Sequence, residues 1–307
     1  MRNNSQYYNN IDFNDLEGQE RYNALISQKE PEILKKWGEE QYELKKKLIK
    51  TDDPILKNIK YIGGVDISFQ KDINKDKDEP KMGISALVIC DIKTLKIVYE
   101  DYKIVKIDEP YIPGFLAFRE VKHFVNLIED LKKNAPKYIP QVILVDGNGI
   151  FHNKGFGLAS HLGVLVDIPT IGCGKTVFAV DGITKRKVEN INYYDLEKKG
   201  DSKALIGKSG IQWGYALKSS DEYDDDPMII SIGHKISNET ALKIAKIACI
   251  YRVPEPIRLS DLISRRLVGA HRRFLKRFPN KEWNIKRYLK EKNNYIHSNL
   301  YEYLNFI

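Results

Sequence analysis

Cysteine is scarce in this chain of 307 residues. The three cysteines, Cys90, Cys173 and Cys249, are odd in number, far apart and set in apolar runs. This pattern argues against a disulfide framework and against a cysteine-rich zinc site, because both need paired or closely spaced cysteines. We therefore expect buried thiols in a reducing compartment, the cytosol or the nucleus.

Long apolar runs are also missing. No stretch approaches the roughly 20 apolar residues that a membrane-spanning helix needs. The N-terminal sequence "MRNNSQYYNNIDFND" is polar and lacks the apolar centre of a secretory signal. We expect a soluble protein without a membrane partner.

Two nucleotide-binding motifs are incomplete. Gly147, Gly149 and His152 occupy the glycine positions of a dinucleotide fingerprint, but a histidine stands where the third glycine belongs. The Gly-Lys-Thr at 174–176 ends like a P-loop, yet Pro169 replaces the opening glycine and offers no N–H to a phosphate. The sequence therefore argues against a nucleotide-binding protein.

What the chain does contain is enough apolar sequence for a large core. Hydrophobic residues make up 42% of it. The formal net charge of +8 permits a polyanionic partner such as nucleic acid but does not identify one. The polar residues 1–30 show no periodic apolar pattern, so we expect a mobile arm there.

The rest of the chain predicts an α/β fold with a mixed sheet. Residues 31–50 have the spacing of an amphipathic helix, and three β-rich runs at 60–70, 82–92 and 96–107 predict consecutive antiparallel strands. A helical segment and the apolar run "QVILVD", typical of a buried parallel strand, come next. Further alternation follows, with a helix at 157–166, a strand at 169–174, a hairpin at 205–217, a strand at 228–233 and a helix at 237–251. We expect three antiparallel strands followed by parallel strands, flanked by helices.

Three acidic residues interrupt otherwise apolar patterns. Asp66 lies within the strand "GGVDISF", Asp146 ends "VILVD", and Glu120 lies at the edge of the apolar stripe of its helix. Buried carboxylates need a partner, and a group of them suits Mg²⁺ and phosphodiester hydrolysis. Each also has a plainer explanation: a turn residue at Asp146, a backbone hydrogen bond for Asp66, or solvation of Glu120.

Three cationic or titratable side chains are candidates for the same site. His152 follows the turn after Asp146, Lys175 ends the next strand, and His234 follows the strand "MIISIG". A histidine or lysine there can act on a phosphate or a leaving oxygen, although a lone histidine is often a core residue. We expect His161, on an apolar helix, to be structural.

The stretch "PYIPGF" places Tyr111 and Ile112 between Pro110 and Pro113. Prolines stiffen the loop, so the two apolar side chains are predicted to project as a wedge of the kind that separates stacked bases. The alternative is a hydrophobic staple that closes the start of the following helix.

Taken together, these motifs resemble the endonuclease V family. "GGVDISF", "PYIPGFLAFRE", "VDGNGIFHNKGFGLASHLG", "PTIGCGK", "GYALKS" and "ISIGHKIS" follow the family's order, and "GFLAFREV" and "RVPEPIRLSDLISR" look like eukaryotic members. The resemblance implies a ribonuclease H-like fold and dependence on Mg²⁺, with Mn²⁺ also supporting activity. It further implies hydrolysis of the second phosphodiester 3′ to an inosine, leaving 3′-hydroxyl and 5′-phosphate ends.

The resemblance also implies roles for individual residues. Asp66, Glu120 and Asp146 are the metal-site carboxylates, His152 and Lys175 act at the scissile phosphate, and 110–113 is the wedge. Glycines let the backbone approach an extruded base, and the residues implied in holding hypoxanthine are Gly147, Gly149, Gly155, Gly157 and Leu158. Where members commonly carry Ala-Lys-Lys, this chain has Gly-Lys-Thr at 174–176, so a second cation is missing.

We expect a catalytic domain at 31–266 and a basic helical extension at 267–307. The extension either adds phosphate contacts or is a solvated helical face. The eukaryotic character of the motifs favours inosine in single-stranded RNA as the substrate, and the alternative is a DNA-repair enzyme acting on deoxyinosine. A binding module without metal or catalysis is a third hypothesis.

Overall fold

A computed structural model describes residues 31–70, 81–107, 109, 112, 114–221, 226–278, 281–285 and 288. The expected N-terminal arm lies outside these residues. No helix in the described ranges is both long and apolar enough to cross a bilayer.

The core of the fold is an eight-stranded mixed sheet with the order β3-β2-β1-β4-β5-β8-β7-β6. The strands are β1 (Tyr61–Phe69), β2 (Lys81–Asp91), β3 (Ile97–Ile107), β4 (Val142–Asp146), β5 (Thr170–Gly174), β6 (Ser202–Ile206), β7 (Gln212–Leu217) and β8 (Met228–His234). β1, β2 and β3 pair antiparallel, whereas β4 pairs parallel to both β1 and β5. The predicted mixed sheet is confirmed, and β8, β7 and β6 extend it with antiparallel pairs.

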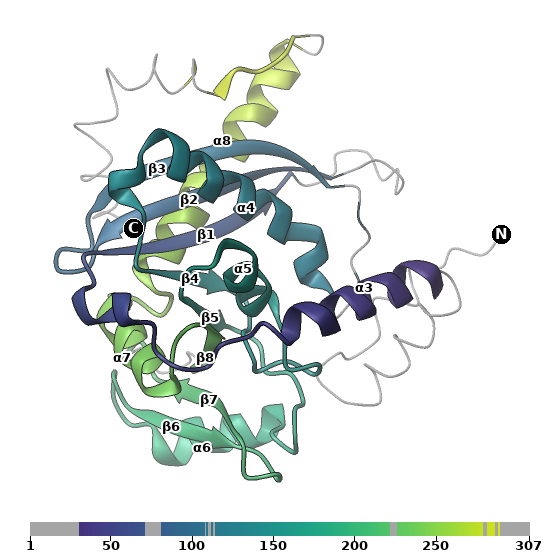
Figure 1. Ribbon diagram of the computed structural model, residues 1–307. Helices are drawn as coiled ribbons and strands as arrows, with labels where there is room; N and C mark the ends of the chain where they lie inside the picture. Colours follow the sequence, from purple (N-terminus) through teal and green to yellow (C-terminus); the bar gives the residue numbers. More distant parts are fainter. Residues whose placement is uncertain are drawn as a thin grey trace.

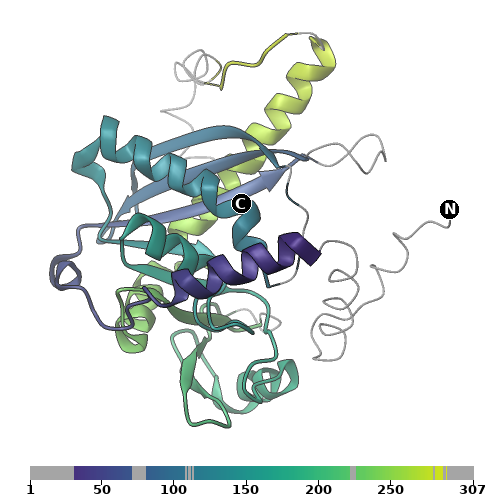
Figure 2. The same cartoon turned by 45° about the vertical axis from the view of Figure 1, so that its right-hand side comes forward.

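Helices cover both faces of this sheet (Figures 1 and 2). They are α3 (Pro31–Lys45), α4 (Leu116–Asn134), α5 (Leu158–Val166), α6 (Lys185–Asp195), α7 (Asn238–Ala248) and α8 (Glu255–Arg277), with short 3₁₀ helices η1 (Pro54–Asn58) and η2 (Pro136–Tyr138). In Figure 1, α4 and α5 lie in front of the strands and α8 lies behind them.

The side chains of β4 show why its sequence is continuously apolar. Val142 and Leu144 pack in one core cluster with α7 and α8, whereas Ile143 and Val145 pack in another with α4 and α5. Because both faces are covered, successive residues of the strand are all buried. The first polar side chain after this run is that of Asp146, at the open end of the strand.

The sequence pattern did not predict α6. Its helix-start signal is weak but present: Thr184 caps the N-terminus by accepting a hydrogen bond from the N–H of Lys187. Only Val188 and Ile191 on this helix are buried. With so few apolar residues, the helix gives little of the periodicity on which the other predictions depended.

The boundary expected between residues 266 and 267 lies inside α8. Beyond it, Leu267, Ala270 and Trp283 are buried against Ile84 and Tyr102 of the sheet. The second half of α8 and the side chain of Trp283 therefore pack in the same core as the sheet, which corrects the boundary expected at residue 267. Residues 291–307 are not described, and the proposed phosphate contacts of the basic tail stay a prediction.

Candidate active site

Asp66 and Asp146 lie side by side because of the strand register. β1 and β4 are parallel, and Val65 is paired with Val145, so each aspartate is the next residue on neighbouring strands. Adjacent strands are about 4.8 Å apart. Two carboxylates distant in the sequence thus meet at one edge of the sheet.

Glu120 joins them from α4. Burial raises the pKa of Glu120 to about 8, and the negative charges of Asp66 and then Asp146 add to the shift, while Arg119 opposes it. Burial likewise raises the pKa of Asp66 to about 7, with contributions from Asp146 and then Asp261. The three predicted carboxylates are therefore near enough to repel one another.

The sequence reasoning missed a fourth carboxylate, Asp261, on α8. It contributes to the raised pKa of Asp66. Ser264, one turn further along the helix, donates a hydrogen bond from Oγ to Asp66 Oδ2 over 3.1 Å, and Arg265 Nε donates to Asp261 Oδ1 over 2.6 Å. In the sequence, Asp261 is an acidic residue in a segment predicted to be helical and basic. Only its position beside β1 in the folded protein identifies it as part of the carboxylate cluster.

The donor chemistry of this cluster fits a hard divalent cation. Oxygen ligands that repel one another in a largely buried site favour a bound Mg²⁺ or Mn²⁺. Within the described ranges, however, no three acidic, histidine or cysteine side chains are gathered closely enough to hold an ion as they stand. Instead, Lys175 Nζ lies 2.6 Å from Asp146 Oδ2 and neutralises that carboxylate. The set fits by type and charge, without a preformed coordination geometry.

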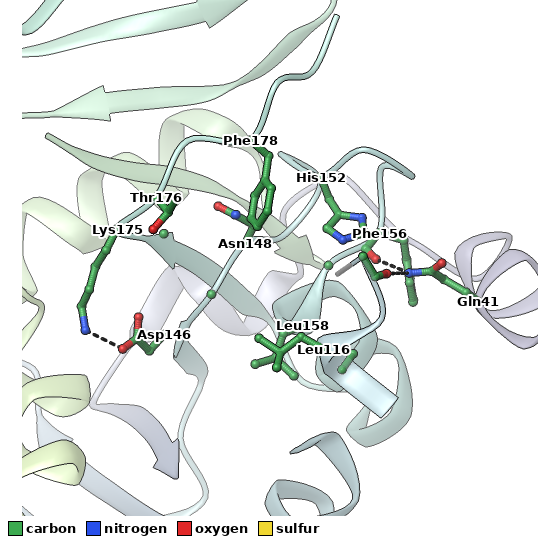
Figure 3. A pocket seen from close by; sticks show the side chains of 15 residues that line it. Gln41, Leu116, Asp146, Asn148, His152, Phe156, Leu158, Lys175, Thr176 and Phe178 are labelled. Atoms are coloured by element: carbon green, nitrogen blue, oxygen red, sulfur yellow. Dashed lines mark hydrogen bonds and ion pairs between the residues drawn. The ribbon is translucent and has the colours of Figure 1, made fainter. Parts of the chain in front are cut away.

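A cavity of about 280 Å³ opens beside Asp146 (Figure 3). Asp146 and Lys175 lie at one side of it, and Leu116, Phe156 and Leu158 provide apolar walls. Such a mixture of apolar walls and a few polar groups is typical of a ligand site. The cavity and the carboxylate cluster share Asp146.

Of the four glycines predicted to hold the base, two line this cavity and two do not. Gly147 and Gly157 line it, and Gly147 has a φ of +153°, which favours glycine. Gly149 does not line it: a Cβ there would lie 1.9 Å from the carbonyl oxygen of Ile232. The expectation that Gly149 approaches the base is thus wrong, because its missing side chain lets β8 pack closely.

Gly155 also lies away from the cavity lining. Its φ is +65°, and a Cβ would lie 2.8 Å from Lys45 Nζ. The Lys45 ammonium donates to the carbonyl of Lys154 over 2.6 Å. Gly155 therefore serves the turn and its contact with α3 and not the base pocket, which corrects the expectation for this residue.

His152 lies in the cavity wall as a neutral side chain. Burial lowers its pKa to about 3, and the charges of Lys154 and Lys45 act in the same direction. Its Nδ1 accepts a hydrogen bond from the N–H of Lys154 over 3.2 Å. Acceptance at Nδ1 places the ring proton on Nε2, so the ring offers a donor at that atom.

His234 is at the wrong edge of the sheet for catalysis. It pairs with Thr170, the first residue of β5, whereas Lys175 follows the last. A five-residue strand separates the two edges by roughly 15 Å. His234 accepts from the N–H of Ile49 over 3.3 Å and faces Asp167. Its candidate catalytic role is therefore wrong, since β8 runs antiparallel to β5.

The expected wedge is described only at Ile112. Pro110, Tyr111 and Pro113 lie outside the described residues. The Ile112 side chain is 1% exposed and packs with Phe115. It does not project, which corrects the expectation for this residue and agrees better with the alternative of an apolar contact at the start of α4.

The sequence reasoning also missed Gln41 and Asn148, both of which line the cavity. Gln41 Nε2 donates to the carbonyls of Gly114 at 3.2 Å and Phe156 at 2.9 Å, so α3 joins two loops of the cavity wall (Figure 3). The sequence did contain a signal for Gln41: it follows Trp37 by four residues, which places a polar side chain on the apolar stripe of α3. His161 is buried between aromatic rings, as expected for a structural histidine.

Comparison of the sequence with known proteins identifies its family. The family model described as Endonuclease V matches residues 42–262. Endonuclease V of Mus musculus is 40% identical over 243 residues, covering 77% of this chain and 70% of the mouse protein. Endonuclease V of Homo sapiens is 39% identical over 240 residues, covering 76% of this chain and 83% of the human protein.

Comparison with solved structures identifies the same family. Human ENDOV superposes with a TM-score of 0.70 at 37% identity, covering 78% of this chain and 99% of that chain. Endonuclease V of Ciona intestinalis also gives 0.70, at 34% identity, covering 78% of this chain and 98% of that chain. That protein was solved in complex with a 23mer DNA containing an inosine followed by a ribo-adenosine. The expected ribonuclease H-like α/β architecture is confirmed, and this chain belongs to the endonuclease V family.

Proposed function

We propose that this protein is a metal-dependent endonuclease that cuts a single strand of RNA at an inosine, at the second phosphodiester on its 3′ side. One observation carries the proposal: Asp146 belongs both to the carboxylate cluster and to the cavity wall. A base held in the cavity therefore places its own strand beside the carboxylates.

Asp66, Glu120 and Asp146 would hold Mg²⁺, or Mn²⁺ in its place, with Asp261 beside them. A bound divalent cation polarises the phosphate and makes a water molecule more acidic. Burial and repulsion raise the pKa of Asp66 and of Glu120, and a nearby positive charge would offset both effects and keep these two groups ionised. Hydrolysis joins the water oxygen to phosphorus and releases the 3′-oxygen of the nucleotide that follows the inosine, so the products carry 3′-hydroxyl and 5′-phosphate ends.

Lys175 and His152 serve the phosphate and the cavity. Lys175 is near enough to Asp146 to exchange that carboxylate for a phosphate oxygen when a strand binds. Neutral His152 offers a hydrogen-bond donor at Nε2 without adding charge. Thr176 follows Lys175 directly, so Lys175 has no cationic neighbour in the sequence on that side.

The apolar part of the cavity suits an extruded base. Leu116, Phe156 and Leu158 offer nonpolar surface, and Gly147 and Gly157 add backbone groups without side chains. Enzymes that act at a single base hold it outside the stack by contacts of this kind. The Ciona intestinalis complexes, which contain an inosine, support hypoxanthine as that base.

The strands in those complexes are DNA in which a ribo-adenosine follows the inosine, and the ribose at that one position is what supports RNA as the substrate. The competing function is repair of deoxyinosine in DNA. We place the activity in the cytosol or nucleus, since all three cysteines are buried and free.

The test compares matched oligonucleotides that contain inosine in RNA, deoxyinosine in DNA, or adenosine in either. We expect cleavage of the inosine RNA with Mg²⁺ or Mn²⁺ and none with EDTA. Faster cleavage of the deoxyinosine DNA would favour the repair function instead. Absence of cleavage of every inosine strand with both metals would overturn the proposal of an inosine-specific nuclease.

A second experiment separates catalysis from binding alone. Asp66→Ala is expected to lower turnover by at least about 1,000-fold while the inosine strand still binds. Asp167→Ala, at the opposite edge of the sheet beside Lys235, is the matched control. Cleavage at the original rate by Asp66→Ala would remove this carboxylate from the site.

A further inference from the structure

Asp66 and Ser68 lie on the face of β1 that α8 covers. Residues two apart on a strand point to the same side of a sheet, so both side chains reach toward this helix. Ser264 of α8 is 0% exposed, and its Oγ lies 3.1 Å from Asp66 Oδ2 and 2.6 Å from Ser68 Oγ. One hydroxyl on the helix therefore contacts both residues of the strand.

The directions of these hydrogen bonds follow from the chemistry of the acceptors. A hydroxyl has one proton, and Ser264 can give it to Asp66 or to the carbonyl of Asp261, which lies 3.0 Å away. An ionised carboxylate, the form that binds a cation, is the stronger acceptor and cannot donate in return. Ser68 then donates to Ser264, so the two hydroxyls form a short chain that ends at Asp66 Oδ2.

This contact differs from the one at Asp146. There Lys175 Nζ occupies Oδ2, and a divalent cation has to displace this ammonium group because like charges repel. The neutral hydroxyl of Ser264 does not repel a cation, so its bond to Asp66 can persist when a metal binds. Oδ1 of Asp66 has no hydrogen-bond partner among the described residues, and it is the oxygen that remains for a metal.

We propose that Ser264 is a positioning residue for the metal site, whose hydroxyl holds Asp66 through Oδ2 and leaves Oδ1 for a divalent cation. This inference rests on the proposed function, because it requires that the carboxylate cluster binds a metal. Hydrogen bonds to a ligating carboxylate fix its orientation, and their loss commonly lowers metal affinity by about 10-fold to 100-fold. The alternative is that the Ser264 hydroxyl only bonds to a carbonyl of its own helix.

Ser260 provides a matched control for that alternative. It lies one turn earlier on α8, is also 0% exposed, and donates from Oγ to the carbonyl of Ile257 over 2.8 Å. Ser264 has the same spacing to the carbonyl of Asp261. Of these two serines, Ser264 alone reaches a carboxylate, so a comparison of Ser264→Ala with Ser260→Ala isolates that contact.

The experiment measures the binding of Mn²⁺ alone to the full-length protein, from the loss of the electron paramagnetic resonance signal of the free ion. We expect Ser264→Ala to raise the dissociation constant of Mn²⁺ by about tenfold or more, and Ser260→Ala to leave it unchanged.

Cleavage of inosine RNA should show the same difference. In single-turnover reactions of Ser264→Ala, the Mn²⁺ concentration that gives half of the maximal rate should rise by the same factor. The rate at saturating Mn²⁺ should fall much less, because the carboxylate itself is still present. Binding of the inosine strand in EDTA should be the same for the unchanged protein and both variants.

Ser264→Cys keeps the test valid if Ser264→Ala does not fold. Cysteine is close to serine in size, but its thiol is only a weak donor, so this variant should also weaken Mn²⁺ binding. Thermal unfolding without metal identifies the variants that fold.

Two results would overturn the inference. The first is a folded Ser264→Ala or Ser264→Cys protein with the Mn²⁺ affinity of the unchanged protein. The second is an equal loss of affinity in Ser260→Ala, which indicates a general effect on α8. In contrast, an unchanged protein that binds no Mn²⁺ would count against the proposed metal-dependent function itself.

Discussion

Lys175 Nζ lies 2.6 Å from Asp146 Oδ2, so the residue that follows β5 neutralises the carboxylate that ends β4. The two strands are parallel neighbours, and their carboxyl ends therefore meet. This pair marks the place where a phosphate and a divalent cation would replace the direct contact. It joins the carboxylate cluster to the cavity that opens beside Asp146.

Removal of the lysine charge should impair catalysis more than folding. For Lys175→Ala we expect a fall of about 100-fold in single-turnover cleavage at saturating metal, because a cation that stabilises charge at the phosphate is lost. Lys203→Ala is the control, since this lysine pairs with Asp195 at the far edge of the sheet. An unchanged rate for Lys175→Ala would contradict its role.

The stability of the metal-free protein should depend on pH through Asp66 and Glu120. Both have a raised pKa in the folded protein, about 7 and about 8, mainly because of burial. Between their unfolded values near 4 and these folded values, the folded state binds more protons than the unfolded state. The free energy of unfolding therefore falls as pH rises from about 4 to about 8.

Thermal unfolding at pH 5.5 and pH 8.5 measures this effect. Asp66→Asn should weaken the dependence, because the amide does not titrate. Added Mg²⁺ should restore stability mainly at the higher pH, where the carboxylates are ionised. The same stability at both pH values, without metal and in both proteins, would show that the two carboxyl groups are not perturbed as described.

Substitution of the two histidines proposed from the sequence, His152 and His234, should have different effects. His152→Ala should slow cleavage by roughly 10-fold to 100-fold, since it removes a donor from the cavity wall. His234→Ala should keep the cleavage rate and instead lose about 1–3 kcal/mol of stability, because the N–H of Ile49 loses its acceptor. Slow cleavage by a stable His234→Ala protein would return this residue to the candidate site.

Trp283 should stabilise the fold although it lies beyond α8. It is 6% exposed and stacks on His271, with ring centroids 5.0 Å apart. Trp283→Ala is therefore expected to cost about 3 kcal/mol in the free energy of unfolding, measured by denaturant titration. Tyr193→Ala, at a side chain that is 76% exposed, is the control. Equal stability of the two variants would show that the segment after α8 contributes no core packing.

Local patterns in the sequence predicted much of this architecture. Continuous apolar runs identified the buried strands, and the charged interruptions at Asp66 and Asp146 identified the edge where chemistry is possible. Such signals are visible because burial of a charge is unfavourable wherever the strand lies. The sequence pattern did not predict the polar helix α6 or the burial of the C-terminal segment, because the packing of both depends on partners far away in the chain.

The sequence by itself determined the family, the mixed sheet and the identity of three carboxylates, because these depend on motifs and on alternation along short segments. Tertiary structure decided which residues share a site. The antiparallel direction of β8 took His234 to the opposite edge, and close packing against β8 gave Gly149 a structural role. It also brought Asp261 near Asp66 and left Asn148 Oδ1 buried without a hydrogen bond in the described part of the chain. Strand direction and the packing of distant segments are not local properties, so no pattern within one segment reveals them.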